Sequence, residues 1–122
     1  MKERTITIQG KQVSLAYCAA TENGFEELSG KSINDIDYHR QRDLTTLGLA
    51  AIVAAHSRKG EEPPVDADTI NFDATKDELV SLMKTVLELR MEWYGIPKIV
   101  ADKLEREIKE AGENEGEETP KN

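Results

Sequence analysis

The sequence predicts a mostly helical α+β fold in which an N-terminal β-hairpin packs on a bundle of about four helices. Three observations predict it. Residues 4–17 alternate polar and apolar side chains with a period of two, which is typical of paired strands. Residues 43–59 and 76–94 instead place apolar side chains at helical spacing. The length of 122 residues fits one compact globular domain, which we expect to span residues 1–111.

In the predicted hairpin, residues 4–17 (RTITIQGKQVSLAY), a two-residue turn is expected at Gly10 and Lys11. Glycine in the first turn position suits a type II′ turn. This turn pairs Ile8 with Val13 and gathers the β-favouring side chains on one face of the ribbon. An isolated hairpin is marginally stable in water, so this face is expected to pack on something helical.

A short helix is predicted at residues 21–29. Phe25 and Leu28 lie three positions apart on one side of it, and Gly30 follows as a stop. The apolar side is therefore expected to face the core.

Residues 43–59 are expected to form the central helix, with Asp43 as its N-cap. Apolar or small side chains occupy nearly every side of this segment, and a helix that is apolar all round is usually buried. Its small residues, which would let neighbouring helices approach closely, are Gly48, Ala50, Ala51, Ala54 and Ala55.

The next segment, residues 61–73 (EEPPVDADTINFD), has two prolines, several acids and no helical period, so it is predicted to be a loop. A short extended piece is expected at residues 69–72. Residues 61–78 together carry seven acids and one lysine. Such segments are usually solvated, although they also permit a basic partner.

The clearest predicted element is a helix over residues 76–94. Thr75 and Glu78 form a capping box at its start, and Gly95 and Pro97 stop it.

A last helix is predicted at residues 98–111, followed by an acidic tail, residues 112–122, that is expected to be disordered because it has no apolar residue. The narrow apolar stripe of this last helix comprises Val100, Leu104, Ile108 and Ala111. Such a stripe suits packing along one side only.

Helix 76–94 has an apolar arc of about 200°, although a surface helix needs little more than about 100° to reach its own core. Either the extra arc is ordinary core, or part of it is exposed and binds a partner helix or a second copy of the chain. The residues expected at such a partner surface are Leu82, Met83, Leu87, Arg90, Met91, Trp93 and Tyr94. Because Arg90 lies inside the arc, it must pair with a carboxylate, extend to solvent, or lie at a boundary that another chain completes.

The net charge of −8 argues against a nucleic-acid or anionic-membrane partner, because binding to phosphate groups relies on lysine and arginine. Cys18 is the only cysteine, which excludes an internal disulfide or a thiolate metal cluster and fits a reducing compartment. The chain has no apolar signal-peptide core and no run near the roughly 18 apolar residues of a membrane span. We therefore expect a cytoplasmic protein.

The motifs of common enzymes are missing: the sequence has no phosphate loop, dinucleotide fingerprint or zinc-protease motif. His39 and His56 share no helical face, which argues against a metal pair. The segment from Asp66 departs from a calcium loop at its fifth and sixth positions, Ile70 and Asn71. We therefore expect no catalytic residue, no metal, no cofactor and no enzymatic activity.

A hairpin (TITIQGKQVSLAY), a helix ending in FEELSGKSINDI, an alanine-rich central helix, an acidic loop and a helix ending in Trp-Tyr-Gly-Pro follow one another over residues 5–111. This order resembles the small tail assembly chaperones of long-tailed phages and prophages. The residues that carry the likeness are Phe25, Leu28, Gly30, Ser32 and Ile33. The resemblance implies a chaperone in the bacterial host cytoplasm that coats the helical, aggregation-prone tape measure protein and recruits tail tube subunits. It also implies a longer form made by ribosomal frameshifting near the 3′ end of the gene.

A second hypothesis is a small acidic regulator, antitoxin-like or anti-restriction, that neutralises a basic protein through residues 61–78 and the tail. Ionic strength distinguishes the two, because a complex held by exposed charges weakens steeply with salt and an apolar interface does not. Both hypotheses also allow the chain to form a homo-oligomer.

Overall fold

The computed structural model describes residues 2–96 together with residues 103, 106, 107 and 110. The fold is mostly helical α+β, as predicted. In chain order its elements are β1 (Glu3–Ile8), β2 (Lys11–Ala16), α1 (Ala19–Ser29), the 3-10 turn η1 (Ile33–Asp35), α2 (Gln41–Arg58), the π-helical turn η2 (Thr69–Asp73) and α3 (Lys76–Trp93).

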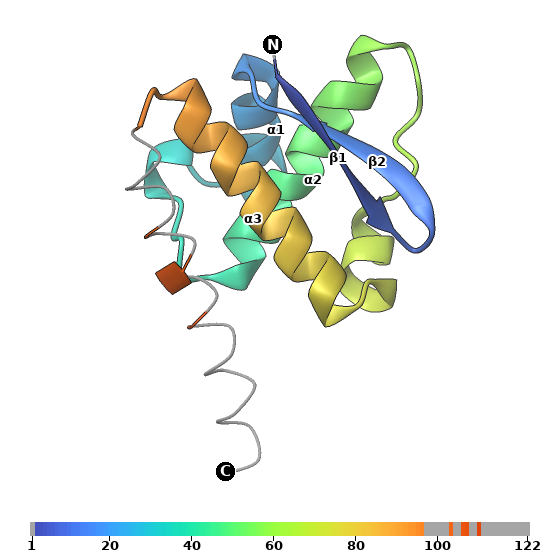
Figure 1. The fold of residues 1–122 in the computed structure, drawn as a ribbon. Coiled ribbons are helices and arrows are strands. Elements are labelled where there is room, and N and C mark those ends of the chain that lie inside the picture. Colours follow the sequence, from blue (N-terminus) through green and yellow to red (C-terminus); the bar gives the residue numbers. More distant parts are fainter. Residues whose placement is uncertain (1, 97–102, 104–105, 108–109, 111–122) are drawn as a thin grey trace, which may run out of the picture.

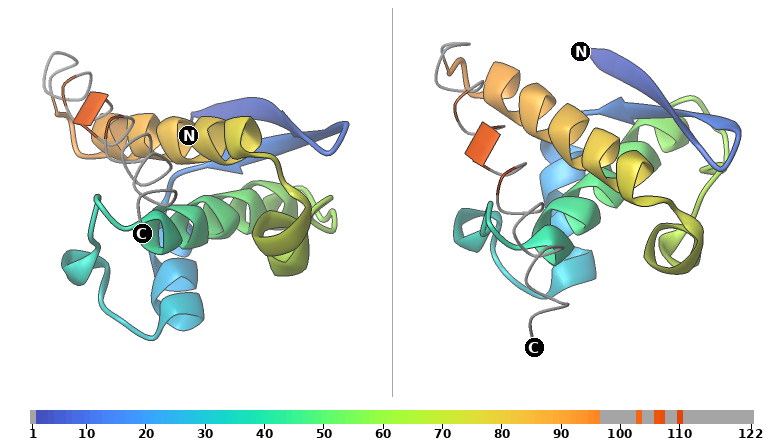
Figure 2. Two further views of the ribbon diagram at one scale, coloured as in Figure 1. Left: turned by 90° about the horizontal axis from the view of Figure 1, so that it is seen from below. Right: turned by 60° about the horizontal axis from the view of Figure 1, so that its bottom comes forward.

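Helix α2 is the centre of the structure, because α1, α3 and β2 all pack on it (Figure 1). Figure 2 shows α3 and the hairpin on one side of α2, whereas α1 extends away from α2 on the other side. The prediction that this alanine-rich helix is central is therefore confirmed. Its buried aliphatic residues are Leu44, Leu47, Ala50, Ala51, Ile52 and Ala55.

The hairpin turn differs from the predicted one by one position. Gln9 and Gly10 form it, with φ angles of 52° and 76°, which makes it a type I′ turn rather than type II′. Ile8 therefore pairs with Lys11, and the predicted pairing of Ile8 with Val13 is wrong by two residues. A shift of two keeps each side chain on its original face, so the apolar face of the ribbon still reaches the core.

Contacts with the start of α3 explain why a non-glycine residue takes the left-handed conformation in this turn. The Gln9 backbone N–H donates to Glu78 Oε2 at 2.9 Å, and the Gln9 side-chain Nε2 donates to the Asp73 carbonyl at 2.8 Å. Glu78 also receives the Thr75 N–H at 3.0 Å and completes the predicted capping box with it. The hydrogen bonds from Thr75 and Gln9 hold the pKa of Glu78 below its usual value.

Helix α1 begins two residues earlier than predicted, with Cys18 as its N-cap, and ends at Gly30, whose φ of 76° gives the predicted left-handed stop. Phe25 is fully buried, whereas Leu28 is 53% exposed. The shared apolar side predicted for these two residues therefore faces the core only at Phe25.

The prediction that Asp43 caps α2 is wrong, since the helix begins at Gln41 and Arg40 is the N-cap. Asp43 is instead buried, with 6% of its side chain exposed, and its carboxylate receives the Lys31 ammonium at 2.5 Å and the Asp37 N–H at 2.9 Å. Burial acts to raise the pKa of Asp43, but the hydrogen bonds from Lys31 and Asp37 outweigh it and leave this pKa lowered.

Because the pKa of Asp43 is lowered by folding, its ionised form stabilises the fold above the unfolded pKa of about 4, and this stabilisation is lost as pH falls through the folded value. We expect Asp43→Asn to lower the free energy of unfolding at pH 7. The difference in free energy of unfolding between the variant and wild type should shrink in acid. Urea unfolding, monitored by circular dichroism at several pH values, measures this difference. The exposed Asp68→Asn is the control, and a gap for Asp43→Asn that stays constant with pH would contradict the assignment.

The extended piece predicted at residues 69–72 is wrong, because Thr69–Asp73 is helical. The Asp66 carboxylate accepts hydrogen bonds from the Thr69 N–H at 2.9 Å and the Thr69 hydroxyl at 3.0 Å, which starts a helical turn. Ile70 is buried by this turn, while Phe72 is 81% exposed.

Helix α3 runs over Lys76–Trp93, within one residue of the prediction, and Gly95 follows with a φ of 70°. The predicted helix 98–111, including its apolar stripe, and the tail 112–122 lie mostly outside the described residues. The four described positions there, Lys103, Arg106, Glu107 and Glu110, are helical and exposed.

Candidate functional site

The wide apolar arc of α3 is mostly core. α2 packs on one part of it and both strands pack on another, so two neighbours share the arc. Of the seven residues expected at a partner surface, five are buried: Arg90 is 9% exposed, and the four apolar ones are Leu82 at 0%, Met83 at 6%, Leu87 at 0% and Met91 at 2%. These four side chains lie in the core of the described fold, which is the first of the two alternatives left open for the arc.

Arg90 pairs with a carboxylate, the first of the three explanations predicted for it. Its Nη1 donates to Glu22 Oε2 at 3.1 Å and to the Tyr17 hydroxyl at 2.6 Å, and its Nε donates to the Tyr38 hydroxyl at 2.8 Å. The guanidinium also lies 4.8 Å from the centre of the Tyr94 ring. This polar cluster ties the end of α3 to α1 and to the segment before α2.

The hydrogen bonds of the cluster indicate a role in stabilising the fold. Glu22 Oε2 accepts from Arg90, from the Tyr17 hydroxyl at 2.8 Å and from the Tyr94 hydroxyl. Burial, and then the hydrogen bond to Glu22, raises the pKa of Tyr17, and the hydrogen bond to Glu22 raises the pKa of Tyr94. Both hydroxyls therefore stay protonated at neutral pH, and the Glu22 oxygen that they share is already fully used as an acceptor.

Trp93 and Tyr94 are the two residues of the predicted partner surface that remain accessible, at 50% and 49% exposed. They lie at the C-terminal end of α3, where the Trp93 ring is 6.1 Å from the Tyr17 ring. Exposed aromatic side chains of this kind often anchor protein interfaces.

A larger apolar surface lies between α1 and α2, which we call the α1–α2 groove. Its cavity volume is about 940 Å³. Its lining comprises Cys18, Ala20, Asn23, Gly24, Glu27, Leu28, Ala50, Val53, Ala54, Ser57 and Arg58. A Cβ on Gly24 would lie 3.3 Å from the Ala50 Cβ, so the two helices nearly touch at the bottom of the groove. Leu28 and Val53, which is 39% exposed, form its apolar sides.

The sequence predictions missed this groove. Gly24 inside a short helix was its only signal, since an interior glycine often marks close helix packing. The sequence does not show that Gly24 packs on Ala50, because this contact depends on how α1 and α2 pack in the folded chain.

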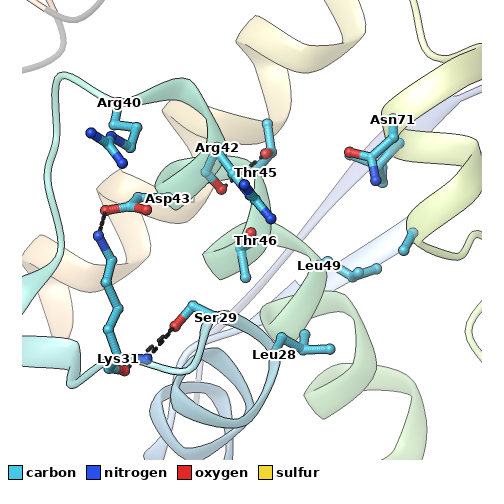
Figure 3. A pocket seen from close by; sticks show the side chains of 12 residues that line it. Leu28, Ser29, Lys31, Arg40, Arg42, Asp43, Thr45, Thr46, Leu49 and Asn71 are labelled. Carbon is cyan, nitrogen blue, oxygen red and sulfur yellow. Dashed lines mark hydrogen bonds and ion pairs between the residues drawn. The ribbon is translucent and has the colours of Figure 1, made fainter.

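A second hollow adjoins the start of α2, which we call the cationic pocket. It has a cavity volume of about 350 Å³. Figure 3 shows Lys31 and Arg40 on one side and Leu28 and Leu49 on the other, with Arg42 between them. Asp43 is the only acid among the described residues that line it, and it is paired with Lys31.

The two histidines are not placed together. His39 is exposed, whereas His56 is 8% exposed and accepts the Ser14 N–H at Nε2 over 3.1 Å, with Glu61 3.3 Å from its Nδ1. Within residues 2–96 and the four described positions beyond, no group of three or more metal-binding side chains occurs.

The described helices include none that is long and apolar enough to cross a membrane.

Compared with models of known protein families, with curated proteins and with solved structures, the chain matches none.

Proposed function

We propose that this chain is a non-enzymatic binding protein that holds a helical client in the α1–α2 groove, and that it acts as a tail assembly chaperone of a long-tailed phage. The observation that carries the proposal is the groove itself, an open apolar channel with small residues at its base. The resemblance in element order and in FEELSGKSINDI supplies the phage role, with the tape measure protein as the client and the tail tube protein as a second partner.

The dimensions of the groove suit a helix. Helix α1 has 11 residues, which at 1.5 Å per residue is about 16 Å, or about three turns of a client helix lying along it. Small residues at the base let the client backbone approach closely, and apolar side chains at the rim contact its apolar face. The polar residues Asn23, Glu27 and Ser57 also line the groove, as expected at a polar rim.

Replacing Val53 with glutamate tests the groove. A charge introduced on its apolar side would be desolvated by a bound helix, so we expect recovery of co-expressed tape measure protein with the tagged chain to fall by about tenfold or more. Val53 is 39% exposed, so circular dichroism and the unfolding midpoint should change little.

Phe72→Ser is the matched control, because Phe72 is 81% exposed and does not line the groove. Its client recovery should equal that of wild type. Trp93→Ser tests the other exposed apolar surface. Full recovery with Val53→Glu and loss with Trp93→Ser would place the client on the end of α3 and overturn the groove assignment.

The phage role has an independent check in the genome. A tape measure reading frame just downstream of this gene supports the role, and its absence opposes it.

The recovery experiment, repeated at rising salt concentration, addresses the acidic-regulator alternative. That alternative requires a basic partner whose binding weakens steeply with salt. Several acids of residues 61–78 already have partners in the fold, such as Asp66 with Thr69 and Glu78 with Gln9, which favours the groove as the binding surface.

A further inference from the structure

The α1–α2 groove and the cationic pocket are neighbours, because Leu28 lines both. On α2 the lining continues from one to the other through Thr46, Leu49 and Val53, at helical spacing of three or four residues. A helix in the groove would therefore reach the pocket with one of its ends.

The charge of the pocket is opposite to that of the chain. The net charge of the chain is −8, whereas the described residues that line the pocket include three cations and one acid. Asp43 is occupied by Lys31 and the Asp37 N–H. Arg40 and Arg42 are exposed, and neither guanidinium makes an ion pair or a hydrogen bond with another residue that the structure describes, although the charge of Arg40 helps to lower the pKa of Asp43.

We propose that the client segment is an apolar helix with carboxylate side chains at one end, and that these carboxylates pair with Arg40 and Arg42 while the apolar face occupies the groove. This inference rests on the proposed function in one respect, that a helix binds the groove. Guanidinium groups suit the role because their planar donors match a carboxylate with two hydrogen bonds. The apolar residues Leu28 and Leu49 on the opposite side of the pocket explain why the acids adjoin an apolar segment rather than arriving alone.

The probes are synthetic amphipathic Ala/Leu helices of about 15 residues, long enough to be helical when bound. One carries three glutamates at its N-terminus, one carries them at its C-terminus, and one has glutamines in all those positions. Binding is measured by fluorescence anisotropy of labelled peptide against wild type, Val53→Glu, Arg58→Gln and the double variant Arg40→Gln/Arg42→Gln. The double variant Lys59→Gln/Lys84→Gln, which changes the net charge equally at exposed positions outside the pocket, is the control.

We expect one of the two glutamate peptides to bind about tenfold more tightly than the glutamine peptide, as two charge-assisted contacts allow. The preference should fall to within about twofold in Arg40→Gln/Arg42→Gln, persist in the lysine control and weaken with salt. Equal binding of all three peptides to wild type would overturn the inference, as would a preference that survives Arg40→Gln/Arg42→Gln. A preference lost only in Arg58→Gln would also overturn it, because Arg58 lies at the other end of the groove.

The glutamine peptide separates this inference from the proposed function. If it binds and Val53→Glu abolishes the binding, the groove assignment stands whatever the acids do. If no peptide binds, or if Val53→Glu has no effect, the groove assignment fails and this inference fails with it. Triglutamate without the apolar helix should bind at least about tenfold more weakly than the best peptide, and equal binding would mean that the pocket takes free acids instead.

Discussion

Replacing Arg90 with methionine is expected to lower the free energy of unfolding by about 3 kcal/mol, the lower end of the range for breaking a buried ion pair. The reason is the carboxylate left behind. The Glu22 side chain is only 19% exposed and would lose the cation that compensates its burial. The Tyr38 hydroxyl would also lose its donor from the Arg90 Nε.

Urea unfolding at neutral pH, followed by circular dichroism, measures the effect. Arg90→Lys is the matched control because it keeps the charge. One ammonium cannot reproduce the planar donor set that joins Tyr38 on one edge to Glu22 on another, so an intermediate loss is expected. A loss of less than about 1 kcal/mol for Arg90→Met would show that the cluster does not stabilise the fold.

A double-mutant cycle separates the ion pair from its neighbours. Arg90→Met combined with Glu22→Leu removes both charges, so the combined loss should be smaller than the sum of the two single losses by at least about 1 kcal/mol. Additive losses would instead assign the stability to the tyrosine hydroxyls and the Tyr94 ring.

The sequence predicted best those elements whose signals are local. Helix α3 starts where Thr75 and Glu78 cap it, and these two residues are three apart in the chain. The Gly30 stop after α1 is equally local, since a glycine suits the left-handed position whatever packs nearby. Both predictions are confirmed within one residue.

Two of the errors arose where a contact with a residue elsewhere in the chain holds the position concerned. Asp43 has the composition of an N-cap, but Lys31 and Asp37 take its carboxylate. The hairpin turn moved to Gln9 because Glu78, which is 69 positions away, holds that residue. Local propensity gives no information on such partners.

The same reasoning explains what could be predicted of the candidate site. The amphipathic pattern of α3 correctly indicated surplus apolar surface, but the pattern does not say how many neighbours cover it. The hairpin and α2 cover it from two sides, and Tyr38 and Ile96 pack on Leu87 and Met91 near its end, so the arc became core. The exposed apolar groove formed instead between α1 and α2, where Gly24 and Ala50 bring two helices together without bulky side chains to fill the space above them.

The contact between α2 and α3 gives the second large prediction. A Cβ on Gly48 would lie 2.7 Å from Leu82 Cγ and 2.8 Å from its Cδ1. Leu82 is 0% exposed, so its side chain can shift only against the other residues of the core. Gly48→Ala should therefore lower the free energy of unfolding by about 2 kcal/mol, although alanine alone would favour a helix interior by about 1 kcal/mol.

A matched glycine shows whether the loss comes from crowding or from helix propensity. At Gly24 the added Cβ would lie 3.3 Å from the Ala50 Cβ, a tight contact that a small shift of the helices relieves. Gly24→Ala should therefore change the free energy of unfolding by less than about 0.5 kcal/mol, because the gain in propensity offsets the crowding. Equal losses at the two glycines would contradict a specific contact with Leu82.

Shortening Leu82 tests the same contact from the other side. Leu82→Ala alone should lower the free energy of unfolding by about 3 kcal/mol, because it opens a cavity in a fully buried position. In the double variant Gly48→Ala/Leu82→Ala the new methyl group occupies part of that cavity and the clash disappears. The combined loss should then be smaller than that of Leu82→Ala plus that of Gly48→Ala by at least about 1 kcal/mol, since the two residues share one space between α2 and α3.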